Sequence, residues 1–332
     1  MLSFSLLYPQ ALLTRLLSPL VGKIVGEEDG DTIDITTPPF RAGQIIAPAA
    51  LEGTIVRLRE RVDSLAETLP RDPALQELTA FIDPIDGTKE FCTGKGEQCS
   101  IMIGFADGAS GQAVAGLVYR PLCPQQSWAL GCAREGTFEA NLRRSDEGAE
   151  AHARGSFLVS NSGNSAFLDA LRTDLGYEAC PAGGAGNKGL LVLEQPSAVY
   201  IQDRGVSRWD TCAPQAVLEA KGGLMVMLQP VVQGKVATPP TLTSYTYRAG
   251  GTNADFVAGV ARLTKYNSRE GVLSEADLTK GAPPRYAETP EDLKPYANTL
   301  GLLALKTAEP QMLETLRTSI ERVANAVQPA FD

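Results

Sequence analysis

The feature that most constrains this chain is an apolar run that leads directly into two aspartates, Leu78–Phe91 ("LTAFIDPIDGTKEF"). The run predicts a strand, and the Asp, Pro and Gly residues that follow it are turn formers. By itself the stretch fits an ordinary turn equally well, because Asp-Gly is a common hairpin signal. The choice between a turn and a functional loop therefore depends on the rest of the chain.

Length and composition favour an α/β or α+β enzyme with a substantial core. The chain has 332 residues, of which 43% are hydrophobic, and its 32 glycines and 22 prolines indicate many loops. That length is enough for one large domain or two ordinary ones. A net charge of −9 argues against a nucleic-acid partner, which requires a basic face. No apolar run reaches the ~18 residues that span a bilayer, so no membrane partner is expected.

The six cysteines are scattered and form neither a CxxC pair nor a zinc-binding pattern. This distribution is typical of reduced core thiols, so we expect a cytoplasmic protein. An organelle is the alternative, because the first 20 residues are apolar. Pro9 and Arg15 interrupt them and no basic leader is present, which favours an amphipathic helix over a targeting segment.

Periodicity predicts strands and helices that alternate along the chain. Gly-rich turns between apolar runs predict two hairpins. The expected strands are 23–26, 78–83, 156–162 and 197–202, and the expected hairpins are 99–121 and 127–140. The expected helices are 1–20, 54–69, 164–176, 185–195, 209–223 and 310–327. In the helix at 54–69, one face carries Ile55, Leu58, Val62 and Leu65.

Acidic residues gather at three places, Glu27–Asp29, Asp83 with Asp86, and Asp210, each where a strand ends or a helix begins. Carboxylates without His or Cys favour a hard cation such as Mg²⁺. The only histidine, His152, lies in a polar stretch, so His-based triads and His-rich zinc sites are not expected. Taken alone, Asp210 is better explained as a helix N-cap.

The order of residues in "DPIDGT" suits a phosphate site. In an extended segment, Asp83, Asp86 and the carbonyl of Ile85 can be aimed at one point. Gly87 and Thr88 would then begin a helix, whose free N–H groups and positive dipole end attract a phosphate. The Thr88 hydroxyl can orient a metal-bound water. The segment thus combines carboxylates that can bind cations with a helix amino end that can bind an anion. This combination predicts a phosphatase-like site.

Three motifs in this order resemble the signature of the Mg²⁺-dependent, lithium-sensitive phosphatases of the inositol monophosphatase superfamily: "GEED" (26–29), "DPIDGT" (83–88) and "WDTCAPQAVLEAKGG" (209–223). The resemblance covers most of 20–225 and returns at "YANTLGLLAL". The residues of three segments are most similar to those of the 3'(2'),5'-bisphosphate nucleotidases: "DPIDGTKEF", "GGAGNK" (183–188) and "RWDTCAP". The resemblance implies a layered α-β-α-β-α sandwich with two subdomains, in agreement with the α/β pattern above.

The resemblance also implies which residues hold Mg²⁺, with two or three ions in the site. Thr88 matches a residue that helps to activate the attacking water, beside Glu27 and Asp83. Glu28 and Asp29 have no ligand role carried over. The positions that match metal ligands are Glu27, Asp83, the Ile85 carbonyl, Asp86 and Asp210.

On the substrate side, Gly184, Lys188 and Ser160 match positions that contact the nucleotide, and Gly87 and Thr88 adjoin the phosphate. The implied activity is a Mg²⁺-dependent phosphomonoesterase that removes the 3'-phosphate of adenosine 3',5'-bisphosphate, with its sulfated precursor as a second substrate. The cations would clamp the phosphate and lower the pKa of bound water. Lys188 would hold the phosphate that stays.

Two subdomains are expected, 1–155 with the metal ligands and 156–332 with the substrate-binding segment. A basic and polar stretch at 142–156 separates them. Residues 228–295, rich in Pro, Gly and Thr, are expected to form a loop-rich insertion.

Two departures from the family pattern leave alternatives open. The family has a Thr-x-Ala-Asp segment before "GEED", whose Asp supports the metal site, and no residue in 1–20 is acidic. We therefore expect a truncated first subdomain with weak activity that needs high Mg²⁺, or a non-catalytic binder of phosphorylated ligands. Second, the nucleotidases carry a His in the segment aligned with "SNSGNS", where this chain has Gly163. That departure keeps an inositol polyphosphate 1-phosphatase as an alternative.

Overall fold

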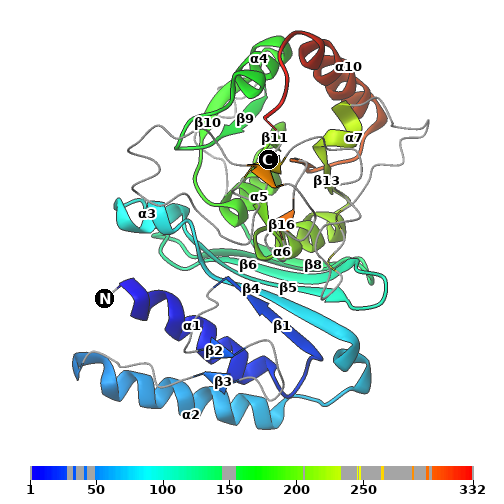
Figure 1. Ribbon diagram of the computed structural model, residues 1–332. Coiled ribbons are helices and arrows are strands. Elements are labelled where there is room, and N and C mark those ends of the chain that lie inside the picture. Colours follow the sequence, from blue (N-terminus) through cyan, green and yellow to red (C-terminus); the bar gives the residue numbers. More distant parts are fainter. Residues whose placement is uncertain are drawn as a thin grey trace.

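The chain folds into five stacked layers, which alternate between helices and β-sheets (Figure 1). The layered α-β-α-β-α sandwich that the sequence predicts is therefore confirmed. Among the helices described here, none combines the length and the apolar character that a membrane crossing requires. The computed structural model describes residues 2–27, 33–34, 41–42, 49–143, 155–204, 206–232, 245, 247, 263–264, 286–287, 297–298 and 301–330.

The first sheet has six strands within the described residues, in the order β1-β4-β5-β6-β7-β8. β1 runs parallel to β4, and the other neighbours pair antiparallel. Both predicted hairpins are confirmed, because β5 pairs with β6 and β7 pairs with β8. Burial alternates along β5 and β7, as expected for strands that present side chains to two faces of a sheet. The strands are β1 (Lys23–Gly26), β4 (Leu78–Asp86), β5 (Ser100–Asp107), β6 (Ala113–Arg120), β7 (Ser127–Cys132) and β8 (Thr137–Asn141).

Two helices, α1 (Leu2–Leu17) and α2 (Glu52–Thr68), form the layer below the first sheet in Figure 1. α2 lies on α1, where the Tyr8 hydroxyl donates to the Ile55 carbonyl at 3.2 Å. α1 in turn covers β1 and β4, so the predicted amino-terminal helix is confirmed. The core between α1 and the sheet contains Ala11, Leu17, Leu20, Val21, Ile24, Ala80 and Ile82.

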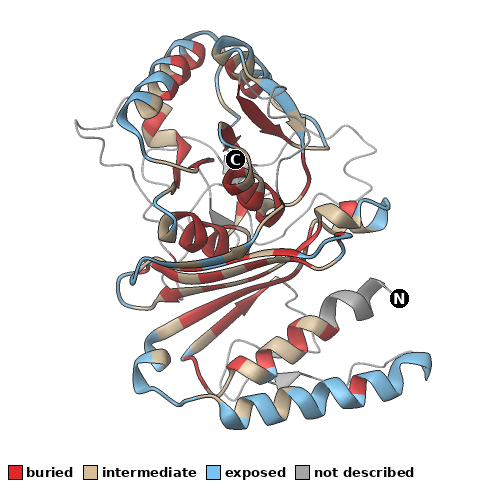
Figure 2. Cartoon of the chain, turned by 180° about the vertical axis from the view of Figure 1, so that it is seen from behind, coloured by how far each residue is buried: buried red, intermediate tan, exposed pale blue. Residues whose placement is uncertain are grey.

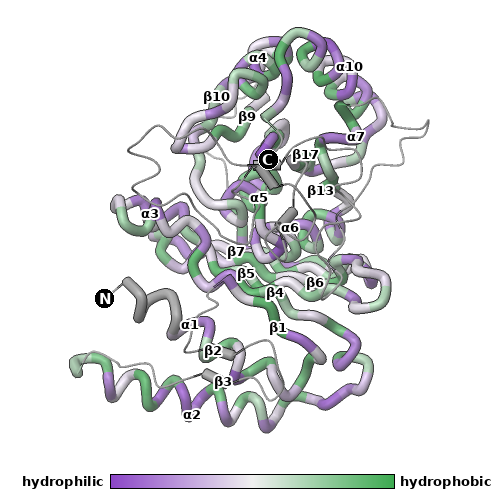
Figure 3. The backbone as a smooth tube through the Cα atoms, viewed as in Figure 1, coloured by the Kyte–Doolittle hydropathy of each residue, from purple (hydrophilic) through white to green (hydrophobic). Residues whose placement is uncertain are grey.

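The predicted apolar face of α2 is mostly exposed. Ile55 is buried, but Leu58 is 44% exposed and Leu65 is 37% exposed. Figure 2 shows most of α2 as exposed, and Figure 3 shows hydrophobic and hydrophilic residues that alternate along it. The spacing predicted the helix correctly but not its burial, because α1 separates most of α2 from the sheet.

The second sheet has the order β10-β9-β11-β17-β13. β9 is parallel to both of its neighbours, and β17 is antiparallel to both of its neighbours. The predictions of β9, β11, α4 and α10 are confirmed, whereas β10, β13 and β17 were not predicted. The strands are β9 (Ser156–Val159), β10 (Glu178–Pro181), β11 (Ala198–Gln202), β13 (Leu224–Met227) and β17 (Leu302–Leu305), and α4 (Ala166–Leu175) and α10 (Pro310–Ala326) cover the outer face.

Between the two sheets, helix α6 (Arg208–Ala220) rests on a row of glycines. Gly104, Gly116 and Gly131 lie opposite one another on β5, β6 and β7. A Cβ at Gly104 would lie 2.6 Å from the backbone nitrogen of Ala213, and one at Gly116 would lie 2.5 Å from its carbonyl oxygen. Any larger residue in this row would therefore push α6 away from the sheet. A second helix, α5 (Ala185–Glu194), lies beside α6 in the same layer, and the helices predicted at 185–195 and 209–223 are confirmed.

The expectation of loops at 228–295 is wrong at its start, where α7 (Leu228–Val232) is helical. Further along, Tyr245 and Tyr247 are buried in the core. Most of 228–295, residues 144–154 of the expected boundary and His152 lie outside the described residues, so the division into two subdomains stays a prediction. The shorter elements are η1 (Ala49–Leu51), η2 (Pro73–Glu77), α3 (Thr88–Cys92), η3 (Gly96–Gln98), β2 (Ile33–Asp34), β3 (Arg41–Ala42), β12 (Val206–Ser207), β14 (Leu263–Thr264), β15 (Tyr286–Ala287) and β16 (Ala297–Asn298).

Replacing Gly116 by Ala should destabilise the fold, because the new methyl group meets the backbone of α6. Overpacking of this kind lowers the free energy of unfolding by about 1–3 kcal/mol. Gly53→Ala is the matched control, since the nearest atom to its Cβ is Arg57 Nη1 at 3.7 Å. The control should be neutral or stabilising, as Ala is the better helix former. Urea unfolding measures both variants, and a Gly116→Ala protein as stable as the wild type would show that α6 does not need the glycine row.

Candidate metal centre

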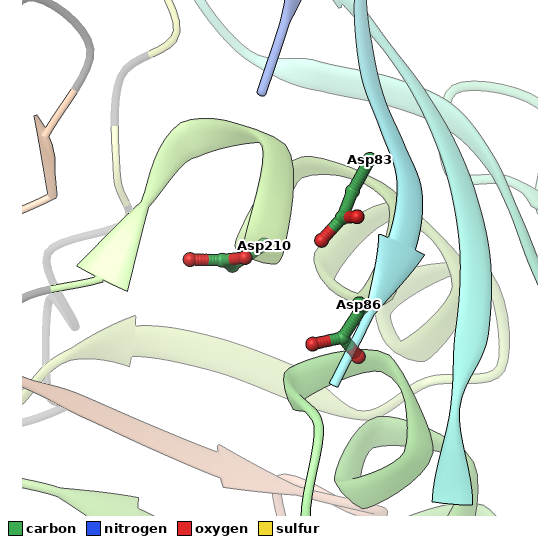
Figure 4. A group of neighbouring side chains, drawn as sticks. All are labelled: Asp83, Asp86 and Asp210. Atoms are coloured by element: carbon green, nitrogen blue, oxygen red, sulfur yellow. The ribbon is translucent and has the colours of Figure 1, made fainter. Parts of the chain in front are cut away.

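Three aspartates from two elements lie close together. Asp83 and Asp86 come from β4 and Asp210 from α6, and one carboxylate oxygen of each lies within 4.8 Å of the others (Figure 4). Residues three apart point to opposite faces of a regular strand. Here the pairing register shifts, so that Asp83 lies opposite Met102 and Asp86 opposite Ser100. The extra residue of this β-bulge turns both carboxylates to the same face.

Asp86 is held by three hydrogen bonds. Its Oδ1 accepts from the backbone nitrogen of Ala185 at 3.0 Å, and its Oδ2 accepts from that of Gly186 and from Ser100 Oγ, both at 2.8 Å. The two amides are the first N–H groups of α5, so the carboxylate lies at the positive end of that helix. Burial raises the pKa of Asp86, and these hydrogen bonds oppose the rise. α5 therefore helps Asp86 to stay ionised.

Asp83 is buried among other acids. It is 1% exposed, and the Ile85 amide donates to its Oδ1 at 3.1 Å. Burial raises the pKa of Asp83 well above its usual range, and the charges of Glu27, Asp86 and Asp210 raise it further. Glu27, which directly follows β1, also shares a hydrogen bond with Asp83. The predicted ligand Glu27 thus lies next to Asp83, although it is not one of the three carboxylates within 4.8 Å.

Asp210 takes part both in the start of α6 and in the acidic cluster. Ser207 is the N-cap, and Asp210 Oδ2 accepts from its backbone nitrogen at 2.8 Å, which completes a capping box. The interpretation of Asp210 as the N-cap is therefore wrong in position, because Asp210 is the third residue of the helix. Burial raises the pKa of Asp210 to about 8, with contributions from the charges of Asp86 and Glu27.

The cluster has the properties of a cation site. Its carboxylates raise one another's pKa, because like charges repel strongly where little water screens them. Oxygen ligands alone suit a hard cation such as Mg²⁺. A divalent cation would remove the repulsion and let the carboxylates ionise near neutral pH. The residues present therefore fit the kind of metal ion that the sequence predicts.

Lys188, on α5, is a buried cation beside these acids. It is 6% exposed, and its Nζ lies 4.7 Å from the centre of the Tyr200 ring. Burial lowers the pKa of Lys188, while the charges of Asp86, Glu90 and Asp210 oppose that change. The lysine can therefore offer a positive charge to an anion that binds at the cluster.

The residues that follow Asp86 form the predicted turn and helix start. Gly87 has a φ of 84° and is the N-cap of α3, which begins at Thr88. The Thr88 hydroxyl donates to the Ile85 carbonyl at 3.3 Å. Thr88 and the predicted ligand Ile85 thus lie in direct contact at the edge of the cluster, and their roles toward metal and substrate stay predictions.

The predicted substrate residues Gly184 and Ser160 lie in turns at the starts of α5 and α4. Gly184 has a φ of 72°, and a Cβ there would lie 2.8 Å from Asp86 Oδ2. Only glycine therefore fits between this turn and Asp86. Ser160 Oγ accepts from the backbone nitrogen of Ser162 at 3.2 Å, within a turn where Gly163 has a φ of 96°. A contact of Ser160 with substrate stays a prediction.

Four residues that border the cluster were not predicted as site residues. They occur singly in a loop, in short helices or at the start of β5, where neither spacing nor a ligand motif marks them. Glu90 stands inside the quoted "DPIDGTKEF", yet that pattern assigns it no role. The four residues are Glu90, Gln98, Ser100 and Asn161.

The model of the inositol monophosphatase family matches residues 23–263. This chain belongs to the inositol monophosphatase family. It is 28% identical over 159 residues to 3'(2'),5'-bisphosphate nucleotidase 1 of Rattus norvegicus, which covers 45% of this chain and 49% of the rat protein. It is 31% identical over 169 residues to inositol monophosphatase 3 of Xenopus laevis, which covers 46% of this chain and 44% of the frog protein.

The chain spans about half the length of the curated relatives that it matches. Among solved structures, an inositol monophosphatase from Zymomonas mobilis superposes with a TM-score of 0.45 at 14% identity, over 95% of this chain and 94% of that protein. The family consists of metal-dependent phosphomonoesterases, and Asp83, Asp86 and Asp210 supply an acidic cluster of the kind that a cation requires.

Without metal, the protein should lose stability as the pH rises from about 4 to about 8. The pKa of Asp210 is about 8 in the folded chain and 3.8 for an ordinary aspartate. Between these values the folded state binds a proton that the unfolded state releases, so stability falls as the pH rises through this window. Saturating Mg²⁺ should remove the fall, because the ion stabilises the ionised cluster.

Asp210→Asn keeps an oxygen acceptor for Ser207. The substitution should make the stability of the metal-free protein depend less on pH, and it should also weaken the stabilisation by Mg²⁺. Thermal unfolding at about pH 5 and pH 8, with and without Mg²⁺, measures both effects. A dependence of stability on pH and on Mg²⁺ that is the same as in the wild type would instead mean that Asp210 acts only in the capping box of α6.

Proposed function

We propose that this chain is a Mg²⁺-dependent phosphomonoesterase that removes the 3'-phosphate from adenosine 3',5'-bisphosphate. The observation that carries the proposal is the convergence of Asp83, Asp86 and Asp210 beside the start of α5, where Lys188 adds a buried positive charge. Acids that bind cations, next to a cation that binds an anion, suit a phosphate bound through metal ions. The name of the rat relative, a 3'(2'),5'-bisphosphate nucleotidase, supports the choice of substrate.

The carboxylates keep the metal in place, and none of them needs to act as a covalent nucleophile. When bound, Mg²⁺ neutralises phosphate charge and lowers the pKa of water. Thr88, whose hydroxyl lies at the Ile85 carbonyl, orients the attacking water together with Glu27 and Asp83. The residues proposed to hold two or three Mg²⁺ ions are Glu27, Asp83, the Ile85 carbonyl, Asp86 and Asp210.

The substrate lies between the start of α3 and the start of α5 in this proposal. Gly87 and Thr88 adjoin the phosphate that is cleaved, and Lys188 holds the phosphate that stays. Gly184 and Ser160 contact the nucleoside side of the substrate. The six cysteines form no disulfide, which agrees with the cytoplasmic location that we propose.

An inositol polyphosphate 1-phosphatase is the second candidate. It is favoured by Gly163, which stands where the nucleotidases carry a His, and by the likeness to inositol monophosphatase 3. Such an enzyme would share the metal ligands and differ in how it binds the rest of the substrate.

Phosphate release tests the proposal. The wild type should hydrolyse adenosine 3',5'-bisphosphate faster than inositol 1,4-bisphosphate, and only with Mg²⁺. Asp83→Asn should reduce turnover at least ~100-fold, because a charged ligand and its electrostatic stabilisation are lost. Preference for the inositol phosphate would select the second candidate. Tight binding of both compounds without turnover would show a non-catalytic binder.

Lys188→Ala should weaken binding of the bisphosphate far more than binding of a nucleoside 3'-monophosphate. A charge-assisted contact contributes roughly 1.5–3 kcal/mol, and the monophosphate lacks the group that Lys188 would hold. Isothermal titration calorimetry measures both affinities, with Lys221→Ala, at the C-cap of α6, as the control. Equal losses for the two ligands would place Lys188 at the cleaved phosphate or in a structural role.

A further inference from the structure

Two side-chain amides connect three segments that border the candidate metal centre. Asn161, in the turn after β9, donates from Nδ2 to Glu90 Oε1 at 3.0 Å and to Gln98 Oε1 at 2.9 Å. Gln98 Oε1 also accepts from the backbone nitrogen of Gly183 at 2.6 Å. The pair thus links α3, the turn that precedes α4 and the turn that precedes α5. These residues are between 63 and 85 positions apart in the sequence.

The peptide groups of Gly183 are held from two sides. The N–H group of Gly183 donates to Gln98, and the carbonyl oxygen of Gly183 accepts from Asn187 Nδ2 at 2.9 Å. Asn187 is itself held, because its Oδ1 accepts from Arg120 Nη1 at 3.0 Å and Arg120 is fully buried. A glycine whose N–H and C=O both bind fixed side chains has little freedom to rotate.

The orientation of Gly183 matters because the groups of the candidate site follow it directly. The amides two and three residues later bind Asp86, and Lys188 lies in the same first turn of α5. The turn is also in close contact with Glu90, since a Cβ on Gly183 would lie 2.2 Å from Glu90 Cδ. Any displacement of the turn would therefore move the donors of Asp86 and the Lys188 ammonium together.

Glu90 makes the second link to Lys188. Glu90 is only 7% exposed, and the negative charge of its carboxylate acts to raise the pKa of Lys188. Asn161 supplies a hydrogen-bond donor to that carboxylate. Without the donor, Glu90 would compete more strongly for the Lys188 ammonium, because a buried carboxylate that loses one partner gains from another.

We propose that Gln98 and Asn161 are positioning residues, which hold Gly183 and Glu90 in place and thereby keep the Lys188 ammonium aimed at the substrate phosphate that is not cleaved. This inference rests on the proposed function. Neither amide belongs to the metal-binding carboxylates, so their loss should impair substrate binding more than the chemical step.

Kinetics of near-isosteric variants tests this role. Gln98→Met keeps the length of the side chain and removes the acceptor, and Asn161→Leu keeps the approximate shape and removes the donor without adding a charge beside Glu90. Each should raise the KM for adenosine 3',5'-bisphosphate roughly 10-fold, the effect of about one hydrogen bond to a charged group, and should leave kcat within about 3-fold. The KM for a nucleoside 3'-monophosphate should stay near the wild-type value. Gln126→Met, in an exposed loop, is the matched control and should behave as the wild type.

A double-mutant cycle separates positioning from a general structural role. In the Lys188→Ala background, Gln98→Met should raise the KM no further, because the residue through which Gln98 acts is already absent. Additive losses would overturn the inference and assign Gln98 a role in general stability. Wild-type turnover together with an unchanged KM in both single variants would overturn this inference alone. A wild type that does not hydrolyse the bisphosphate would overturn the proposed function and, with it, this inference.

Discussion

The close contact between α6 and the first sheet is the constraint on which the rest of the structure depends. Gly104, Gly116 and Gly131 align across three strands, and α6 lies so near to them that a Cβ at any of the three would overlap the helix. This contact brings the start of α6, with Asp210, to the end of β4. Asp83 and Asp86 lie there because a β-bulge turns both toward the helix. The candidate metal centre therefore depends on glycines that contribute no chemistry of their own.

The acidic cluster works against the stability of the metal-free fold, and neighbouring elements offset part of that effect. Burial disfavours the ionised forms of Asp83 and Asp210. α5 counteracts this at its amino end, where two of its amides bind Asp86. At its carboxyl end, Glu194 forms a buried ion pair with Arg120 of β6. The helix is thus tied to the first sheet at both ends, and loss of either ion-pair partner would leave a buried charge without compensation.

Elements with a local pattern were predictable from the sequence, and elements without one were not. The hairpins of the first sheet alternate between faces, and α4, α5, α6 and α10 follow helical spacing. β13 and β17 are buried along their whole length, so four apolar residues in a row carry no alternation that marks them as strands. For α2, spacing predicts that Leu58 and Leu65 share a face but not what that face contacts, which is why their exposure was missed.

The sequence by itself determined which chemical groups stand at the candidate site. In "DPIDGT" the two carboxylates, the turn glycine and the helix start are neighbours in the chain, and their order sets the local geometry. Only the tertiary structure decided that Asp210 completes the cluster within 4.8 Å, that α5 binds Asp86, and that Gln98 accepts from both Gly183 and Asn161. The hydrogen bonds among these contacts join residues 63 to 100 positions apart, and Asp210 lies still farther along the chain from Asp83 and Asp86. They leave no periodic trace in the sequence, because they depend on how the layers pack against one another.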